Sequence, residues 1–170
     1  MTTAIVVAKE WAVNVIGEKV SSQKRLRVLE DQTNAEVYVR TDAAWRSEDK
    51  AAGLGWTIQD TRQGASFKGY QKRVNSALLA ESLALREALL MCKEMEVTNL
   101  RVESDSSVLI KAARGTEPVA ELHGVISDIR LLSSSFQSIS FGWISRDQNG
   151  VAHKLAKDVL YVGDTFMAPT

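Results

Sequence analysis

The chain has 170 residues, of which 45% are hydrophobic and 25% charged, values typical of one globular domain with a short extension. Its 21 Lys and Arg residues balance 21 Asp and Glu residues, and this zero net charge counts against a simple DNA-binding module. The single cysteine excludes an intramolecular disulfide and a cysteine-built zinc site, and no apolar run reaches the roughly 18 residues of a membrane span.

The first part of the chain, residues 1–33, is predicted to be an N-terminal extension. Apolar residues recur at helical spacing between Ala8 and Ile16 and predict an amphipathic helix, which the polar stretch Ser21–Arg25 follows as a linker. The beginning lacks the basic and strongly apolar segments of a secretory signal, so we expect an intracellular location, nuclear or cytoplasmic.

Residues 34–163 have the pattern of an α/β domain. Three strands joined by short turns come first and imply an antiparallel meander, at 36–43, 53–60 and 66–74. The helix Ser76–Met95 follows, rich in Ala, Leu and Glu and free of Gly and Pro, with Ser76 as its N-cap. The remaining predicted elements are a strand at 99–104, helices at 107–113 and 119–133, a strand at 137–144, a helix at 149–162 and a flexible tail at 164–170.

This order predicts a five-stranded mixed sheet with helices on both faces. Three acidic residues lie at the boundaries of its elements, beside apolar neighbours rather than in charged runs: Asp42, Glu81 and Asp105. Strand ends in such a sheet can converge on one crevice. Carboxylates brought together there repel one another unless cations lie between them, and hard oxygen ligands suit magnesium. Two such ions about 4 Å apart can activate a water and stabilise the leaving oxygen of a phosphodiester.

Five segments in this order resemble the type 1 ribonuclease H family, and within it the plant branch found in non-LTR retrotransposon reverse transcriptases. The matching segments are Asp42–Trp45, Gly53–Trp56, Ala80–Leu85, Glu103–Ser106 and Arg146–Ala156. The resemblance extends over about residues 35–162 and implies a ribonuclease H-like fold. It also implies a nuclease that cuts the RNA strand of an RNA–DNA hybrid with two Mg²⁺ or Mn²⁺ ions.

The resemblance implies that Asp42, Glu81 and Asp105 are catalytic metal ligands, together with a fourth ligand at the start of the last helix. The family usually has Asp at that position, whereas this chain has His153. Because neutral imidazole is softer than a carboxylate, we expect weakened activity or a preference for manganese. Asp147, in the preceding loop, is a candidate to compensate.

Discrimination of RNA requires contacts to the 2′-hydroxyl, for which Asn75, Ser76 and Ser107 are candidates. Basic side chains of the third strand and the short helix are candidates for phosphate contacts, although such residues usually only solubilise a surface: Lys68, Lys72, Arg73, Lys111 and Arg114. The family's long basic insertion is not evident between residues 115 and 137, so hybrid affinity should be modest and salt-dependent.

Three tryptophans of the domain, Trp45, Trp56 and Trp143, are predicted to be core residues, with Trp45 also a candidate for the edge of a substrate groove. The expected partner is an RNA–DNA hybrid, bound by a monomer that is either free-standing or part of a larger reverse transcriptase polypeptide. One alternative is a catalytically impaired binding module for nucleic acid or protein, which His153 favours. A 3′–5′ exonuclease or resolvase is less well supported, because the first strand lacks Asp-x-Glu.

Overall fold

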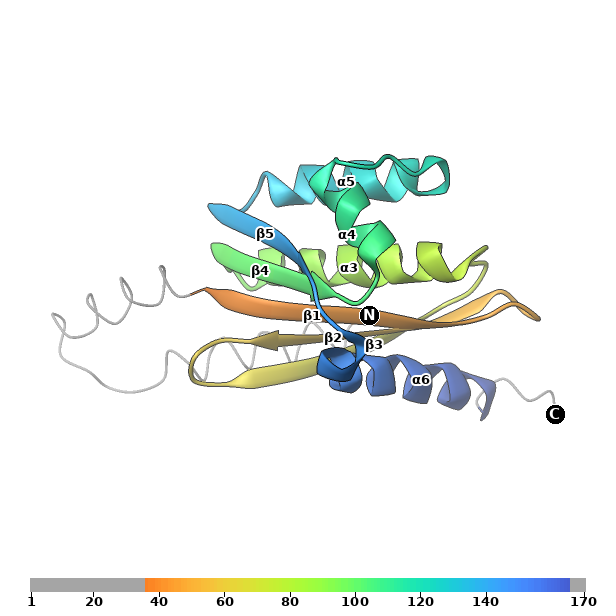
Figure 1. Cartoon of the computed structure of the whole chain (residues 1–170). Coiled ribbons are helices and arrows are strands. Elements are labelled where there is room, and N and C mark those ends of the chain that lie inside the picture. The colour runs from red at the N-terminus through yellow and green to blue at the C-terminus, as the bar shows by residue number, and fades with distance from the viewer. Residues whose placement is uncertain (1–35, 166–170) are drawn as a thin grey trace, which may run out of the picture.

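The computed structural model describes residues 36–165, so the predicted helix and linker of residues 1–33 and the tail residues 166–170 lie outside the described residues. Residues 164 and 165, predicted as part of the flexible tail, belong instead to the last helix. One five-stranded sheet organises this region, in the order β3-β2-β1-β4-β5 (Figure 1). Its strands are β1 (Val37–Arg46), β2 (Ala51–Gln59), β3 (Gly64–Gln71), β4 (Asn99–Ser104) and β5 (Ser138–Trp143). β1, β2 and β3 pair antiparallel, while β4 pairs parallel with both β1 and β5. The predicted mixed sheet is therefore confirmed.

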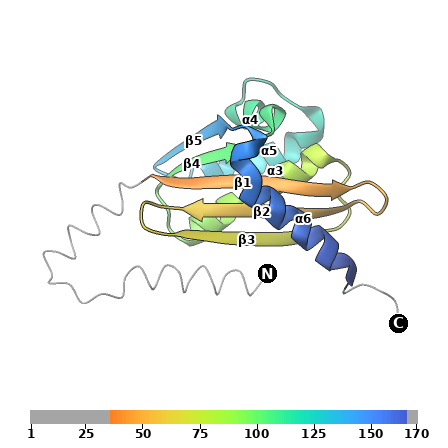
Figure 2. The same ribbon diagram turned by 60° about the horizontal axis from the view of Figure 1, so that its bottom comes forward.

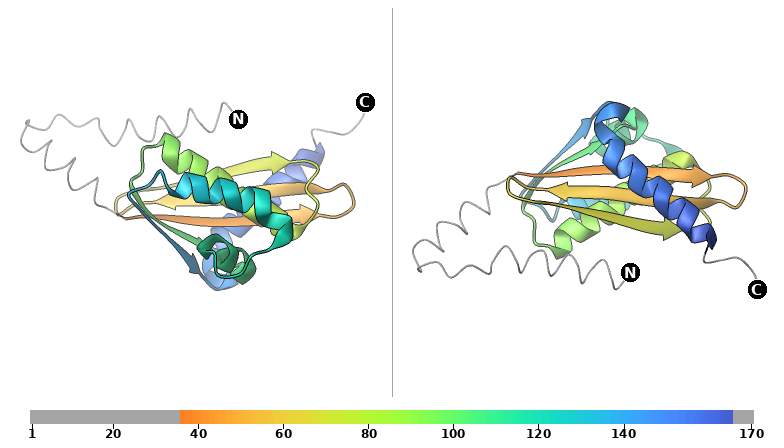
Figure 3. Two further views of the ribbon diagram at one scale, coloured as in Figure 1. Left: turned by 90° about the horizontal axis from the view of Figure 1, so that it is seen from above. Right: turned by 90° about the horizontal axis from the view of Figure 1, so that it is seen from below.

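Helices cover both faces of this sheet. The helical elements are α3 (Ala77–Glu94), α4 (Ser107–Arg114), η1 (Ala120–Leu122), α5 (His123–Ser133), η2 (Arg146–Asn149) and α6 (Gly150–Thr165). α3 and α5 lie on one face, and α6 crosses the other face diagonally over β1, β2 and β3 (Figures 2 and 3). The predicted helix 119–133 begins as a short 3₁₀ turn, η1, and continues as α5. Every helix within residues 36–165 is too short or too polar to traverse a bilayer.

The ends of the helices follow local chemistry. The Ser76 hydroxyl accepts a hydrogen bond from the Leu79 amide at 3.0 Å, which confirms it as the N-cap of α3. Gly115 ends α4 in the left-handed region, with φ of 77°, where a residue without a side chain is favoured. Ser106 caps the beginning of α4 through a hydrogen bond from the Leu109 amide.

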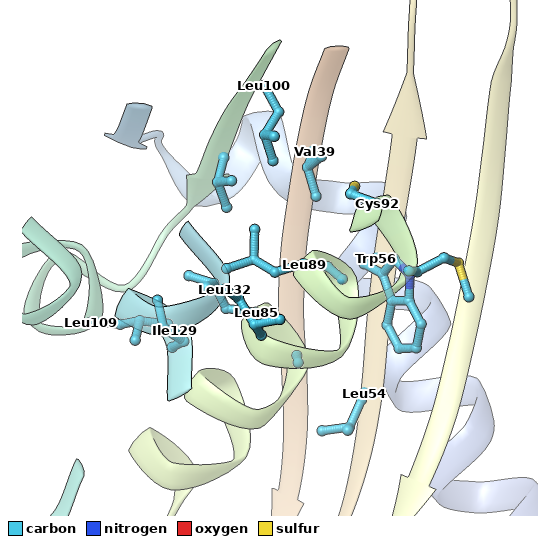
Figure 4. Packing of buried hydrophobic residues seen from close by; sticks show 14 of the residues in the cluster. Val39, Leu54, Trp56, Leu85, Leu89, Cys92, Leu100, Leu109, Ile129 and Leu132 are labelled. Carbon is cyan, nitrogen blue, oxygen red and sulfur yellow. The ribbon is translucent and has the colours of Figure 1, made fainter. Parts of the chain in front are cut away.

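The hydrophobic core lies between the sheet and α3. Leu85, Leu89 and Cys92 of α3 pack toward strand residues such as Val39, and α5 adds Ile129 to the same cluster (Figure 4). The core explains the position of α3, because its buried residues recur on one side of the helix.

The three predicted core tryptophans have different environments. Trp56 is buried and stacks on Phe67 with ring centroids 6.1 Å apart, as predicted. Trp45 is partly buried, and its indole N–H donates to the Val74 carbonyl at 2.8 Å. Trp143 is 56% exposed, so its prediction as a core residue is wrong.

Two glycines of β2 allow α6 to lie directly on the sheet. A Cβ atom at Gly53 would be 1.9 Å from the Ala156 carbonyl oxygen, and one at Gly55 would be 2.3 Å from the Ala152 carbonyl oxygen. Backbone atoms cannot yield as a flexible side chain can, so any larger residue must push α6 away from β2. The Gly-Leu-Gly-Trp segment therefore sets the position of α6.

We expect Gly53→Ala to lower the free energy of unfolding by about 2–3 kcal/mol, because the added methyl group overlaps the α6 backbone. The matched control is Gly124→Ala in α5, where an added Cβ meets no atom within 4 Å and the higher helix propensity of Ala should be neutral or mildly stabilising. Urea denaturation of both variants measures the difference. Equal stabilities for the two variants would contradict the close packing of α6 on β2.

Candidate active site

Asp42 and Asp105 meet where β4 ends beside β1. The parallel ladder between these strands runs as far as the pair Thr41 and Ser104, so each aspartate is the next residue along its own chain. Asp42 continues within β1 and is only 1% exposed, while Asp105 follows β4 directly. Burial raises the pKa of Asp42, and the negative charge of Asp105 raises it further. The two carboxylates therefore act on each other across the end of the sheet.

Glu81 approaches Asp42 and Asp105 from α3, and we call the place where these three carboxylates meet the acidic pocket. Burial raises the pKa of Glu81 to about 7, a hydrogen bond from Ser106 opposes this shift, and the charges of Asp42 and Asp105 add to it. Its Oε2 atom is buried and has no hydrogen-bond partner. A buried carboxylate oxygen without a donor is costly, so this side of the pocket favours a proton or a cation.

His153 faces Asp42 from the beginning of α6. Its Nδ1 atom lies 2.6 Å from Asp42 Oδ2, and its side chain is 28% exposed. This hydrogen bond lowers the pKa of Asp42 and partly offsets the effect of burial. The four residues predicted as metal ligands therefore converge from β1, α3, the end of β4 and α6, although their roles stay predictions.

Two further residues hold Asp105, and the sequence-based prediction gave them no role. Arg146 donates from Nε to Asp105 Oδ2 at 3.2 Å, and the Asn149 amide donates to Asp105 Oδ1 at 3.3 Å and to the Thr41 carbonyl at 2.9 Å. Asn149 is 1% exposed. Both residues belong to the segment just before α6 that carries the family resemblance, so the motif identified the segment but not the contacts.

Arg40 braces this segment from the sheet. Its Nε atom donates to Glu103 Oε2 at 3.0 Å, and its NH1 atom donates to the Gln148 carbonyl at 3.0 Å. Arg101 also donates to Glu103, at 3.0 Å. Arg40 and Glu103 are partners in the β1–β4 ladder, two residues before Asp42 and Asp105 respectively. The Arg40–Glu103 ion pair therefore lies next to the acidic residues in the β1–β4 ladder, and Arg40 connects this part of the sheet to η2.

The other predicted site residues have different environments. Ser76 is engaged as the N-cap of α3 and donates to Glu121 at 2.8 Å, whereas Asn75 and Ser107 are exposed. Asn75 accepts a hydrogen bond from Lys50 at 3.4 Å. Asp147 is exposed in η2 and makes no hydrogen bond within residues 36–165, so its predicted compensating role has no support from contacts.

The acidic pocket is not a preformed metal site. Within residues 36–165, no three His, Cys, Asp or Glu side chains are close enough to hold an ion together. His153 engages Asp42, and Arg146 with Asn149 engages Asp105. The donor chemistry nevertheless fits a hard divalent cation. Glu81 has a buried oxygen without a hydrogen-bond partner, and burial and the neighbouring carboxylates raise its pKa.

Glu81→Gln should alter the pH dependence of stability in the presence of a chelator. The pKa of Glu81 is raised from 4.5 to about 7 in the folded protein, so between these values the native state retains a proton that the unfolded chain has lost. Stability from this group is therefore present below pH 4.5 and is lost as pH rises to 7. At pH about 8 the variant should exceed the wild type by about 2–3 kcal/mol, with no gain near pH 4.

Urea denaturation at several pH values measures this effect. The control is Glu94→Gln at the exposed end of the same helix, which should follow the wild-type profile. Identical profiles for wild type and Glu81→Gln would show that Glu81 is not in a desolvated, repulsive environment.

Solved structures with the same fold were found by comparison of coordinates. The N-terminal RNase H domain of Rv2228c from Mycobacterium tuberculosis, solved as a fusion with maltose-binding protein, is 23% identical, with a TM-score of 0.71, over 79% of this chain and 100% of that chain. RNase H1 from the archaeon Halobacterium salinarum is 24% identical, with a TM-score of 0.70, over 75% and 98%. LC11-RNase H1 in complex with an RNA/DNA hybrid is 20% identical, with a TM-score of 0.68, over 75% and 98%.

These likenesses confirm the predicted ribonuclease H-like fold. No curated protein matches the chain. A family model described as reverse transcriptase-like matches residues 40–159, which include β1 through most of α6 and all four predicted metal ligands. The chain therefore belongs to the reverse transcriptase-like family and carries its ribonuclease H-like domain.

Proposed function

We propose that this chain is a metal-dependent endonuclease that hydrolyses the RNA strand of an RNA–DNA hybrid. The observation that carries the proposal is the convergence of Asp42, Glu81 and Asp105, where burial and the charges of neighbouring carboxylates raise the pKa of Asp42 and of Glu81. A structural role does not need three carboxylates close together at the end of a sheet, whereas they suit the binding of cations that can in turn bind a phosphate. The likeness to ribonuclease H structures supports the choice of substrate.

Asp42, Glu81, Asp105 and His153 would hold two Mg²⁺ or Mn²⁺ ions. Such ions, when bound, supply an activated water and neutralise charge on the leaving oxygen. The chain itself contributes orientation. Asn149 fixes Asp105 relative to the Thr41 carbonyl, and His153 fixes Asp42, so the two strand ends keep their separation.

Recognition of the RNA strand is proposed for exposed groups around the pocket. Asn75 and Ser107 are the better candidates for contacts to the 2′-hydroxyl, because Ser76 is already engaged by the α3 backbone and by Glu121. We further propose a monomer that functions within a larger reverse transcriptase polypeptide, which agrees with the description of the matching family.

Asp42→Asn should reduce cleavage of an RNA–DNA hybrid on the order of 100-fold or more, because it removes a charge from the centre of the pocket. The measurement is release of fragments from a labelled RNA strand in Mg²⁺ and in Mn²⁺. Asp128→Asn, a change of the same chemistry on the exposed surface of α5, is the control and should cleave as the wild type does. The nuclease proposal fails if neither ion supports cleavage above the level of Asp42→Asn.

His153→Asp should raise the ratio of the Mg²⁺ rate to the Mn²⁺ rate by about 10-fold, because a carboxylate is a harder ligand than imidazole. His153→Asn is the control, since it removes the imidazole without adding a charge, and it should give no such gain. An unchanged ratio in His153→Asp would mean that position 153 does not select the metal.

A second candidate function is a catalytically impaired module that binds nucleic acid. The observations that favour it are the 2.6 Å contact of His153 with Asp42 and the hold of Arg146 on Asp105, which occupy the oxygens that a metal needs. Calorimetric titration with Mn²⁺ separates the two candidates. If the chain is a nuclease, it should bind Mn²⁺, and Asp42→Asn should abolish this binding. If it is an impaired module, it should bind the hybrid but not Mn²⁺.

A further inference from the structure

Trp143 is an exposed aromatic residue with a fixed orientation beside the acidic pocket. It is the last residue of β5, its side chain is 56% exposed, and its indole N–H donates to the Asp105 carbonyl oxygen at 3.0 Å. Trp45 and Trp56 instead lie partly or fully buried. Trp143 is therefore attached to the backbone of Asp105 while more than half of its surface remains exposed to solvent.

The position of Trp143 in the strand explains this exposure. Ile139 and Phe141, on the same face of β5, pack against the hydrophobic core. Trp143 continues their alternation two residues further, beyond the point where the core covers the strand. Within residues 36–165 the one stacked ring pair is Trp56 with Phe67, so no aromatic ring of this region covers the indole. Burying an indole would contribute more to stability than exposing it, so folding does not account for its location.

Two guanidinium groups contact neighbours of Trp143: Arg146 contacts the Asp105 side chain, and Arg114 contacts the Phe141 carbonyl. Arg146, whose side chain is 73% exposed, uses only Nε in its contact with Asp105, so its two terminal nitrogens have no partner within residues 36–165. Arg114, exposed at the end of α4, donates from Nε and NH2 to the Phe141 carbonyl oxygen, which leaves NH1 without a partner there. Figure 2 shows α4 beside β5 at this edge of the sheet.

An exposed aromatic ring with cations nearby matches the chemistry of a nucleic acid strand. Guanidinium groups pair with phosphates, and an aromatic ring packs on bases or sugars without regard to sequence. Within an intact duplex the base faces are already stacked, which leaves the sugars accessible from the grooves.

We propose that Trp143 is a substrate-binding residue whose indole packs against the sugar of the nucleotide next to the phosphate that faces the acids. Arg146 and Arg114 bind phosphates of the same strand on either side of it. This inference rests on the proposed function for the identity of that strand, the RNA strand of a hybrid.

The test is hybrid binding by the full chain in the Asp42→Asn background, where cleavage does not interfere. Trp143→Ala should raise the dissociation constant about 5- to 30-fold, as measured by fluorescence anisotropy at a fixed salt concentration. Trp143→Phe, which keeps a ring, should stay within about 3-fold, and Trp143→Gln, which keeps an N–H donor without a ring, should bind as weakly as Trp143→Ala. Leu131→Ala removes another exposed apolar side chain, 73% exposed on α5, and is the matched control.

The outcomes separate the inference from the proposed function. Loss of affinity in Trp143→Ala and Trp143→Gln, with unchanged thermal stability, supports the inference even if the wild-type chain does not cleave. Wild-type affinity in both variants overturns the inference even if the wild-type chain cleaves normally. A chain that binds no hybrid at all overturns both. In the cleaving protein, the same substitutions should raise KM and leave kcat nearly unchanged.

Discussion

Burial of acidic side chains beside one another is the constraint around which this domain is organised. Asp42 is enclosed within β1, Glu81 points from α3 with a buried oxygen that has no donor, and Asp105 lies one step beyond the last β1–β4 pair. In a desolvated pocket such charges are stable only if protons, donors or cations offset them. His153 provides such a contact to Asp42, and Arg146 and Asn149 provide such contacts to Asp105.

The rest of the fold serves to hold these groups in place. Gly53 and Gly55 bring the backbone of α6 against β2, which sets the position of His153. Arg40 and Glu103, in the ladder just before the acids, connect β1 and β4 to the Gln148 carbonyl of η2. The compensating residues are therefore fixed independently of the acids that they contact.

Much of this arrangement could be predicted from the sequence, and the missing parts share a cause. Alternation and helix propensity predicted the five strands and the four α-helices from β1 to α6, because these signals are local, but they predicted neither η1 nor η2 as a separate 3₁₀ helix. No role was predicted for Asn149, because its side-chain amide donates to Thr41 and Asp105, which are distant from it in the chain. Trp143 was placed in the core because its strand alternates regularly. Only the three-dimensional extent of the core reveals that the last residue of β5 lies outside it.

The most direct test of the central claim is a crystal of the full chain soaked in Mn²⁺ and measured at an anomalous wavelength. We predict manganese density in contact with oxygens of Asp42, Glu81 and Asp105, with His153 turned either toward the metal or away from Asp42. Carboxylates that lie on separate surfaces, or an acidic pocket that stays free of manganese at saturating concentration, would contradict the account.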